Sequence, residues 1–245
     1  MRAGIIFIGT NKYINFFEGY RTAIEKFFLP NHEKTFFAFT DQPDHEIFDH
    51  KNVVVTKIDH EPWPYVTLYR FKYMMMVKSQ LLECDKVFFI DADLHANQEI
   101  TDFHLFNHEK SLLGVQHPGW FGKPWIGAFE TNARCRANIF DGNYDLLHYR
   151  QGCFWGGDSK SVVKMVETLE ERVDLDLKDD VVACWHDESH LNKYLLENNE
   201  DVFTLHPGFA QPESPDYNHI RDIFPTMMLH LDKNYSDFPR FEGVK

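Results

Sequence analysis

The sequence Lys-Val-Phe-Phe-Ile-Asp-Ala-Asp, residues 86–93, joins a short apolar segment to two acids. The apolar part, residues 86–90, predicts a buried β-strand. Asp91 and Asp93 follow the end of this strand, and alternate side chains of an extended backbone point to the same side. Two carboxylates in that arrangement suit Mg²⁺ or Mn²⁺, with coordination positions left open for a diphosphate. The Asp-x-Asp pattern alone is also compatible with two solvated acids at a strand end.

Before this strand, apolar strands alternate with helical segments. Strands are predicted at residues 3–9, 35–40 and 53–58, and helices at residues 13–28 and 66–82. Such alternation predicts an α/β fold with a parallel, doubly wound sheet. Sheets of this kind bind ligands at the carboxyl ends of their strands, where the strand order reverses, and Asp91 lies at an end of that type.

After residue 93 the pattern is less regular. We predict a helix at residues 159–172 and a strand at residues 202–205, and the tail from residue 211 is rich in Pro and Asp. The tail also carries Lys233 and Arg240, so we expect it to act as a lid over an anionic ligand. We expect one domain over residues 1–245, with a nucleotide-binding half (1–95), an acceptor and catalytic half (96–210) and the tail (211–245).

The charge of the chain argues against several classes of partner. Lys plus Arg number 25 against 38 Asp plus Glu, which gives a net charge of −13. This charge should repel nucleic acid and anionic membrane surfaces. No apolar run is long enough to span a bilayer, and the four cysteines show no zinc-binding spacing. We therefore expect a soluble, cytoplasmic protein with free thiols, no nucleic-acid partner and no integral membrane segment.

A second informative stretch is Trp-His-Asp-Glu-Ser-His-Leu-Asn-Lys-Tyr-Leu-Leu, residues 185–196. Its apolar residues recur at three- and four-residue spacing, which predicts a helix whose first turn presents Asp187 and Glu188. His186 and His190 are one helical turn apart, so a zinc hydrolase is an alternative. However, zinc proteases usually have Glu directly after the first His, where this chain has Asp, and no third ligand stands out downstream.

Residues 185–194 resemble the signature of glycosyltransferase family 6, which includes the blood-group A and B transferases and the α1,3-galactosyltransferases. Four further segments resemble family motifs in the same order along the chain: Phe-Thr-Asp-Gln-Pro (39–43), Asp-Ala-Asp (91–93), His-Pro-Gly-Trp (117–120) and Trp-Gly-Gly (155–157). The resemblance implies a GT-A type fold, a single Rossmann-like domain with a mixed central sheet. It also implies Mn²⁺- or Mg²⁺-dependent transfer of galactose or N-acetylgalactosamine, with retention, from a UDP-sugar to the 3-hydroxyl of a β-galactoside, which gives an α1,3 linkage.

The resemblance also implies roles for individual residues. Asp91 and Asp93 would hold the metal, and Glu188 matches the proposed nucleophile. The acceptor would be bound by His117, Trp120 and Trp185. The donor would be bound by Ile8, Tyr13, Arg70, Asp91, Gln151, Cys153, Asp187 and Lys233.

Some positions depart from the family pattern. Residues 129–134 read Phe-Glu-Thr-Asn-Ala-Arg where the family has Phe-Thr-Tyr-Glu-Arg-Arg, and Arg240 aligns only with a one-residue offset. Cys153 stands where relatives that accept the N-acetyl group have Gly and those that prefer galactose have Ala. Its bulkier thiol predicts a preference for UDP-galactose. Three hypotheses remain: a retaining UDP-sugar transferase, a zinc hydrolase built on His186 and His190, and a catalytically silent UDP-sugar-binding protein.

Overall fold

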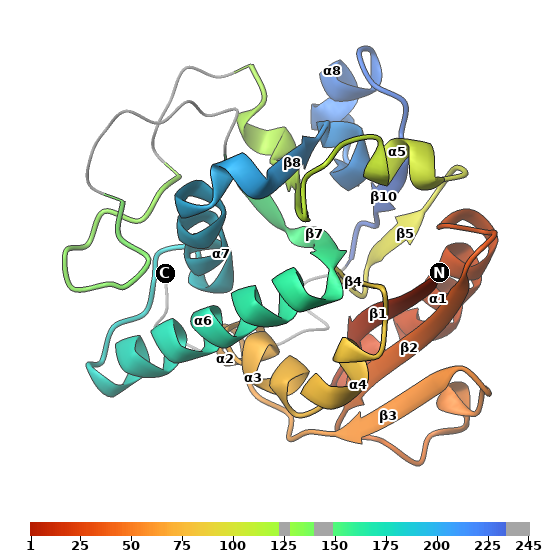
Figure 1. Cartoon of the computed structure of the whole chain (residues 1–245), viewed down its shortest axis with the longest axis horizontal. Coiled ribbons are helices and arrows are strands. Elements are labelled where there is room, and N and C mark those ends of the chain that lie inside the picture. Colours follow the sequence, from red (N-terminus) through yellow and green to blue (C-terminus); the bar gives the residue numbers. More distant parts are fainter. Residues whose placement is uncertain (123–127, 140–148, 234–245) are drawn as a thin grey trace.

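A seven-stranded sheet, in the order β3-β2-β1-β4-β7-β6-β8, forms the centre of the protein (Figure 1). The computed structural model describes residues 1–122, 128–139 and 149–233. The strands of this sheet are β1 (Arg2–Ile8), β2 (Glu33–Thr40), β3 (Val53–Lys57), β4 (Lys86–Ile90), β6 (Leu112–Gln116), β7 (Arg150–Asp158) and β8 (Val202–Leu205).

The sheet is mixed, as expected for the fold class. Strands β1 to β4 pair in parallel, which confirms the parallel arrangement predicted for the first ninety residues. Strand β7 runs antiparallel to both β4 and β6, whereas β8 is parallel to β6. The strand order reverses around β1, which lies between β2 and β4. The loops that leave β1 and β4 therefore meet at one edge of the sheet.

Helices cover both faces of the sheet, because the strands carry apolar side chains on both sides. One face packs against α1 (Phe17–Phe27) and α5 (Asp102–Phe106). The other packs against α2 (Tyr65–Leu68), α3 (Arg70–Met75), α4 (Lys78–Leu82), α6 (Ser159–Lys178) and α7 (His186–Glu197). In Figure 1, α6 crosses the molecule with α7 on one side and α3 and α4 on the other.

The prediction of one helix over residues 66–82 is wrong, since the segment forms the three short helices α2, α3 and α4. Four of its buried residues, Leu68, Phe71, Met74 and Val77, recur at every third position. Residues three apart differ by about 60° around an α-helix, so one continuous helix would turn this row away from the core. The backbone instead leaves the helical region at Val77, with φ −116° and ψ 22°.

Two other predicted helices have different bounds. The segment predicted at 13–28 begins as the 3₁₀ helix η1 (Asn11–Phe16) and continues as α1. Helix α6 extends beyond residue 172 to Lys178, because Val173 and Asp176 continue its buried face. The remaining short helices are η2 (Glu46–Phe48), η3 (Pro118–Trp120), η5 (Asn199–Asp201), η6 (Pro207–Ala210), η7 (Pro215–Tyr217) and α8 (Asn218–Arg221).

A small three-stranded sheet carries the later part of the chain back to the Asp-Ala-Asp segment. It consists of β5 (Leu94–Ala96), β10 (Met228–His230) and β9 (Gln211–Pro212), in that order. Strand β10 is antiparallel to β5, and the backbone N–H of Leu231 donates to the carbonyl of Asp93 at 2.9 Å. All four cysteines are free. No helix in the described part of the chain has the length and apolar character needed to cross a membrane.

Candidate functional site

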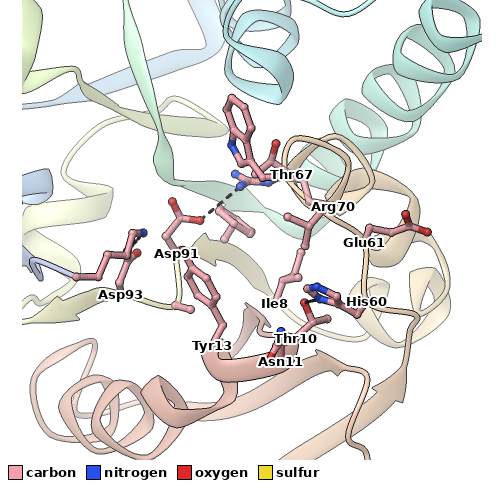
Figure 2. Close-up of a pocket in the computed structure, with 15 residues that line it drawn as sticks. Ile8, Thr10, Asn11, Tyr13, His60, Glu61, Thr67, Arg70, Asp91 and Asp93 are labelled. Carbon is pink, nitrogen blue, oxygen red and sulfur yellow. Dashed lines mark hydrogen bonds and ion pairs between the residues drawn. The ribbon is translucent and has the colours of Figure 1, made fainter. Parts of the chain in front are cut away.

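A pocket of about 330 Å³ opens at the edge of the sheet where β1 and β4 end (Figure 2). Six residues proposed from the sequence for donor or metal binding line it: Ile8, Tyr13, Arg70, Asp91, Asp93 and Lys233. They come from the end of β1, from η1, from α3, from the residues after β4 and from the residues after β10. The tertiary structure thus brings together groups that are up to 225 positions apart in the sequence.

Other residues of the pocket were not predicted from the sequence. Thr10, His60, Glu61, Trp63 and Thr67 also line it. The hydroxyl of Thr10 lies 2.8 Å from Nδ1 of His60, which ties the turn after β1 to the segment before α2. Residues 59–64 read Asp-His-Glu-Pro-Trp-Pro, a turn composition without a chemical motif, so no sequence signal predicts their place in the pocket.

Asp93 lies between two basic side chains on one wall of the pocket. Its carboxylate is 2% exposed. Oδ1 lies 3.1 Å from Nε2 of His230, and Oδ2 is ion-paired with the ammonium group of Lys233. Burial opposes ionisation of Asp93, but the charges and hydrogen bonds of His230 and Lys233 outweigh it and hold its pKa well below the usual range. Asp93 is therefore an anion in the folded protein.

Arg70 connects the pocket to the helix that carries the catalytic candidate. Its guanidinium group is ion-paired with Asp187 at 2.8 Å. It also lies 3.5 Å from Asp91 (Figure 2). It also donates to the carbonyl of Gly152 at 3.1 Å and lies over the ring of Phe89, 4.3 Å from its centroid. These contacts fix a buried cation between two carboxylates, where it can stabilise negative charge on a ligand.

Asp91 and Asp187 both lie in surroundings that disfavour their charge. Burial raises the pKa of Asp91, although Arg70 opposes that effect. Burial likewise raises the pKa of Asp187 to about 7, again against the influence of Arg70. In such surroundings, the ionised form of a carboxylate is stabilised when a cation binds beside it. The pocket therefore has the electrostatics of a cation site.

Glu188 is fixed in the first turn of α7 by two hydrogen bonds. Its Oε1 accepts from the hydroxyl of Tyr149 at 2.6 Å, and Oε2 accepts from the backbone N–H of Gly152 at 2.7 Å. Burial raises the pKa of Glu188 to about 7, and the two hydrogen bonds oppose that shift. The carboxylate is thus held rigidly at the residue next to Asp187.

Two of the acceptor-side candidates, His117 and Trp120, lie around Tyr149, which sequence analysis missed. The ring of Tyr149 lies 5.7 Å from His117 and 6.4 Å from Trp120, measured between centroids. The same tyrosine donates to Glu188, so it links the predicted acceptor residues to the carboxylate. Trp185 precedes α7 and is 49% exposed. A half-exposed indole is a suitable surface for stacking on a sugar ring.

The two remaining donor candidates lie on β7 beside the pocket rather than in its lining. Cys153 is 2% exposed and packs in the apolar core, and its carbonyl accepts from the N–H of Asp91 at 2.9 Å. Gln151 is partly buried, and its side-chain oxygen has no hydrogen-bond partner among the described residues. Their contact with a donor sugar stays a prediction. Arg240 lies outside the described residues.

The donor set at Asp91 and Asp93 fits a divalent cation. One ligand atom each from Asp91, Asp93 and His230 lies within 4.8 Å of the others. Opposite ligands of an octahedral Mg²⁺ or Mn²⁺ are about 4 Å apart, so small side-chain rotations bring all three to one ion. Two carboxylates on a shared pocket wall are also the hard oxygen donors that such ions prefer.

The histidine pair proposed for zinc does not form a metal site. His186 packs edge-on against Trp63, with centroids 4.5 Å apart, and has a positive φ of 51°. His190 is 1% exposed and faces Asp176 at 3.4 Å. Burial lowers the pKa of each histidine to about 4, so both are neutral. Within the described ranges, no group of three candidate ligands includes both histidines.

Known proteins with similar sequences are glycosyltransferases. The profile described as Glycosyltransferase family 6 matches residues 1–218. The O-antigen biosynthesis glycosyltransferase WbnI of Escherichia coli is 32% identical over 198 residues, which cover 81% of this chain and 83% of that protein. The globoside alpha-1,3-N-acetylgalactosaminyltransferase 1 of Gallus gallus is 24% identical, over 96% of this chain and 68% of its own. The histo-blood group ABO system transferase 1 of Rattus norvegicus is 25% identical over 79% of this chain, which matches 56% of the rat protein's length.

Proposed function

Because this chain belongs to glycosyltransferase family 6, we propose that it transfers galactose or N-acetylgalactosamine from a UDP-sugar to the 3-hydroxyl of a β-galactoside, with an α1,3 linkage and retention. One observation carries the proposal. The acidic pocket at the ends of β1 and β4 lies beside a rigidly held carboxylate, Glu188, and Arg70 connects the two.

The donor would lie in the pocket with its uracil against Ile8 and Tyr13 and its diphosphate near Asp91, Asp93 and Lys233. A divalent ion, when bound, would neutralise the charge that develops on the leaving UDP. The cationic side chains Arg70 and Lys233 add to that neutralisation. The ammonium of Lys233 is paired with Asp93, and it would be available to the diphosphate if Asp93 held a divalent ion.

The sugar would lie between the diphosphate and α7. Asp187 would accept hydrogen bonds from its hydroxyls, and Arg70 holds Asp187 in place for this role. As the bond to UDP breaks, positive charge develops at the anomeric carbon and favours a nearby anion. Glu188 would supply that anion, either by covalent attack or by electrostatic support of an ion-pair-like transition state.

The acceptor would bind on the side of Glu188 that faces His117, Trp120 and Trp185. Tyr149 joins this region to Glu188, so an acceptor hydroxyl placed there would approach the anomeric carbon directly. The name of one similar protein, globoside alpha-1,3-N-acetylgalactosaminyltransferase 1, supports the sugar class and the linkage.

We further propose that the donor preference is for UDP-galactose. The thiol of Cys153 is larger than the Gly of relatives that accept the N-acetyl group. Cys153→Gly should therefore raise kcat/KM for UDP-N-acetylgalactosamine relative to UDP-galactose. Competition between the two donors measures the ratio. A wild-type preference for the acetamido donor, or a ratio unchanged by the substitution, would show that Cys153 only packs in the core.

The test of the proposed function is transfer from radiolabelled UDP-sugars to an array of β-galactosides, with Mn²⁺ and with excess EDTA. We expect an α1,3-linked product by NMR and nearly complete loss of turnover with EDTA or in Asp93→Asn. The exposed neighbour Asp232 provides a matched control, since Asp232→Asn should retain activity. UDP binding without transfer to any acceptor would favour a silent binding protein, and full activity in EDTA would exclude the metal role.

A further inference from the structure

His230 is the last residue of β10, and its imidazole is directed at the Asp-Ala-Asp segment. The pairing of β10 with β5 places His230 opposite Leu94, the residue after Asp93. The hydrogen bond from the N–H of Leu231 to the carbonyl of Asp93 fixes the register at this point. The side chain is 22% exposed, and its Nε2 lies 3.1 Å from Oδ1 of Asp93. The fold thus supplies a nitrogen ligand where only two carboxylates were predicted.

We propose that His230 is a third protein ligand of the divalent ion, so that Asp91, Asp93 and His230 together form a mixed oxygen and nitrogen site. The inference rests on the proposed function, because it concerns the ion that would accompany the UDP-sugar. Its geometric support is that the three ligand atoms lie within 4.8 Å of one another. Backbone hydrogen bonds to neighbouring segments hold Asp91, Asp93 and His230 in place, so little reorganisation is needed to bind the ion.

The imidazole among the proposed metal ligands affects which divalent ion the site prefers. Mg²⁺ prefers oxygen ligands in octahedral geometry, whereas Mn²⁺ and later first-row ions accept imidazole nitrogen readily. A site with one imidazole should therefore favour Mn²⁺ over Mg²⁺ more strongly than a site built from aspartates alone. His230 would thereby select the metal rather than act on the sugar.

An alternative role for His230 is to orient Asp93 through the hydrogen bond alone. In the metal-free protein the imidazole and Lys233 share the Asp93 carboxylate. If the ion binds His230 directly, the nitrogen lone pair must point to the metal. If His230 only orients Asp93, its nitrogen keeps a proton and stays outside the coordination sphere. The two roles differ in whether nitrogen is bonded to Mn²⁺.

Pulsed EPR of Mn²⁺ bound to the protein without nucleotide distinguishes these roles. We expect a ¹⁴N hyperfine coupling typical of directly bound imidazole in the wild type, replaced by a ¹⁵N coupling when histidine is ¹⁵N-labelled. The coupling should be lost in His230→Gln and kept in His219→Gln, which changes an exposed histidine of α8. The labelled wild type needs no substitution, so the test stands even if a variant folds poorly.

Metal affinity gives a second readout. His230→Gln should weaken Mn²⁺ binding by about tenfold or more and Mg²⁺ binding much less. His230→Asp should retain metal binding without nitrogen coupling and shift the preference toward Mg²⁺.

Mn²⁺ binding that depends on Asp93 but shows no nitrogen coupling would overturn the inference and leave the proposed function intact. Nitrogen coupling without sugar transfer would uphold the ligand role and overturn the proposed function. Absence of Mn²⁺ binding would overturn the inference and the proposed metal role, and the transfer assay with excess EDTA would then test the proposed function separately.

Discussion

At the scale of single residues, Glu188 combines a fixed position with an unfavourable environment for its charge. Two hydrogen bonds hold both carboxylate oxygens, and burial raises its pKa to about 7. A group held in this way can stabilise positive charge as it develops, without reorganisation. The proposed UDP site is formed by other residues, so loss of the carboxylate should affect kcat far more than nucleotide binding.

We predict that Glu188→Gln folds normally, binds UDP and Mn²⁺ with little change, and loses at least about two orders of magnitude in kcat. Calorimetry with UDP and steady-state kinetics measure the two quantities. Glu197→Gln, at the far end of the same helix, is the matched control and should retain activity. If Glu188→Gln loses only a fewfold in kcat, Glu188 is a structural acid at the start of α7.

The raised pKa values also predict a pH dependence. Glu188 and Asp187 act as anions in the proposed reaction, and burial raises the pKa of each to about 7. Protonation removes the required charge, so kcat/KM should fall as the pH decreases below about 7. A bound metal ion and diphosphate change the local charge, so the profile of kcat can have a different midpoint.

The same shifts indicate that this loss of rate is not acid unfolding caused by these two groups. A carboxyl whose pKa is raised by folding contributes stability when protonated, and that contribution is lost as the pH rises through its folded pKa. Circular dichroism across the pH range should therefore show folded protein where the rate declines. A value of kcat/KM that is constant from about pH 5 to 8 would contradict the assignment.

At the scale of structural elements, Asn192 joins α7 to β7. It is fully buried, accepts from the N–H of Arg150 at 2.8 Å, and donates to the carbonyls of Arg150 and Glu188 at 2.7 and 2.9 Å. The strand thereby holds the helix that carries Asp187 and Glu188. The hydrogen bonds of Asn192 explain how a short helix can keep two buried acids aligned with the pocket.

Removing the side-chain hydrogen bonds of Asn192 should destabilise the protein. We predict that Asn192→Ala lowers the free energy of unfolding by about 2–4 kcal/mol, because it leaves the N–H and C=O of Arg150 buried without partners. Urea unfolding measures the change. Asn198→Ala removes only a bond to Tyr194 at the end of the same helix and should cost less than about 1 kcal/mol. Equal costs for the two variants would refute the special role of Asn192.

At the scale of the whole molecule, the pocket and the surroundings of Tyr149 are formed by different halves of the chain. All residues that line the pocket lie within positions 1–95, apart from Lys233. Those around Tyr149, by contrast, belong to positions 96–210. This distribution supports the proposed division into a nucleotide-binding half and an acceptor half. Glu188 stands between the two groups.

Substitutions in the two halves should therefore separate donor from acceptor binding. Trp185→Ala should raise the acceptor KM about tenfold and leave the Kd of UDP unchanged, because the half-exposed indole lies outside the pocket. Tyr13→Ala should weaken UDP binding instead. Kinetics with varied acceptor and calorimetry with UDP measure the two effects. Similar losses of both affinities in each variant would refute the division.

The sequence by itself determined the class of fold and the family. Strand β4 has the predicted bounds, because a short apolar run flanked by polar residues is a strong local signal. The parallel arrangement of β1 to β4 followed from the alternation of strands and helices. Residues 185–194 and the Asp-Ala-Asp segment indicated the family, since their motifs are contiguous in the chain.

The tertiary structure alone decided which distant residues surround those acids. No local sequence signal predicts that Tyr149 contacts Glu188 or that His230 contacts Asp93. The same holds for the place of His60 and Trp63 in the pocket. The neighbours of these residues come from other strands and helices. The tertiary structure also decided that residues 66–82 break into three helices and that His186 and His190 face different surroundings. Local patterns record backbone preference and the side that is buried, whereas partners across the sheet are set by packing and strand register.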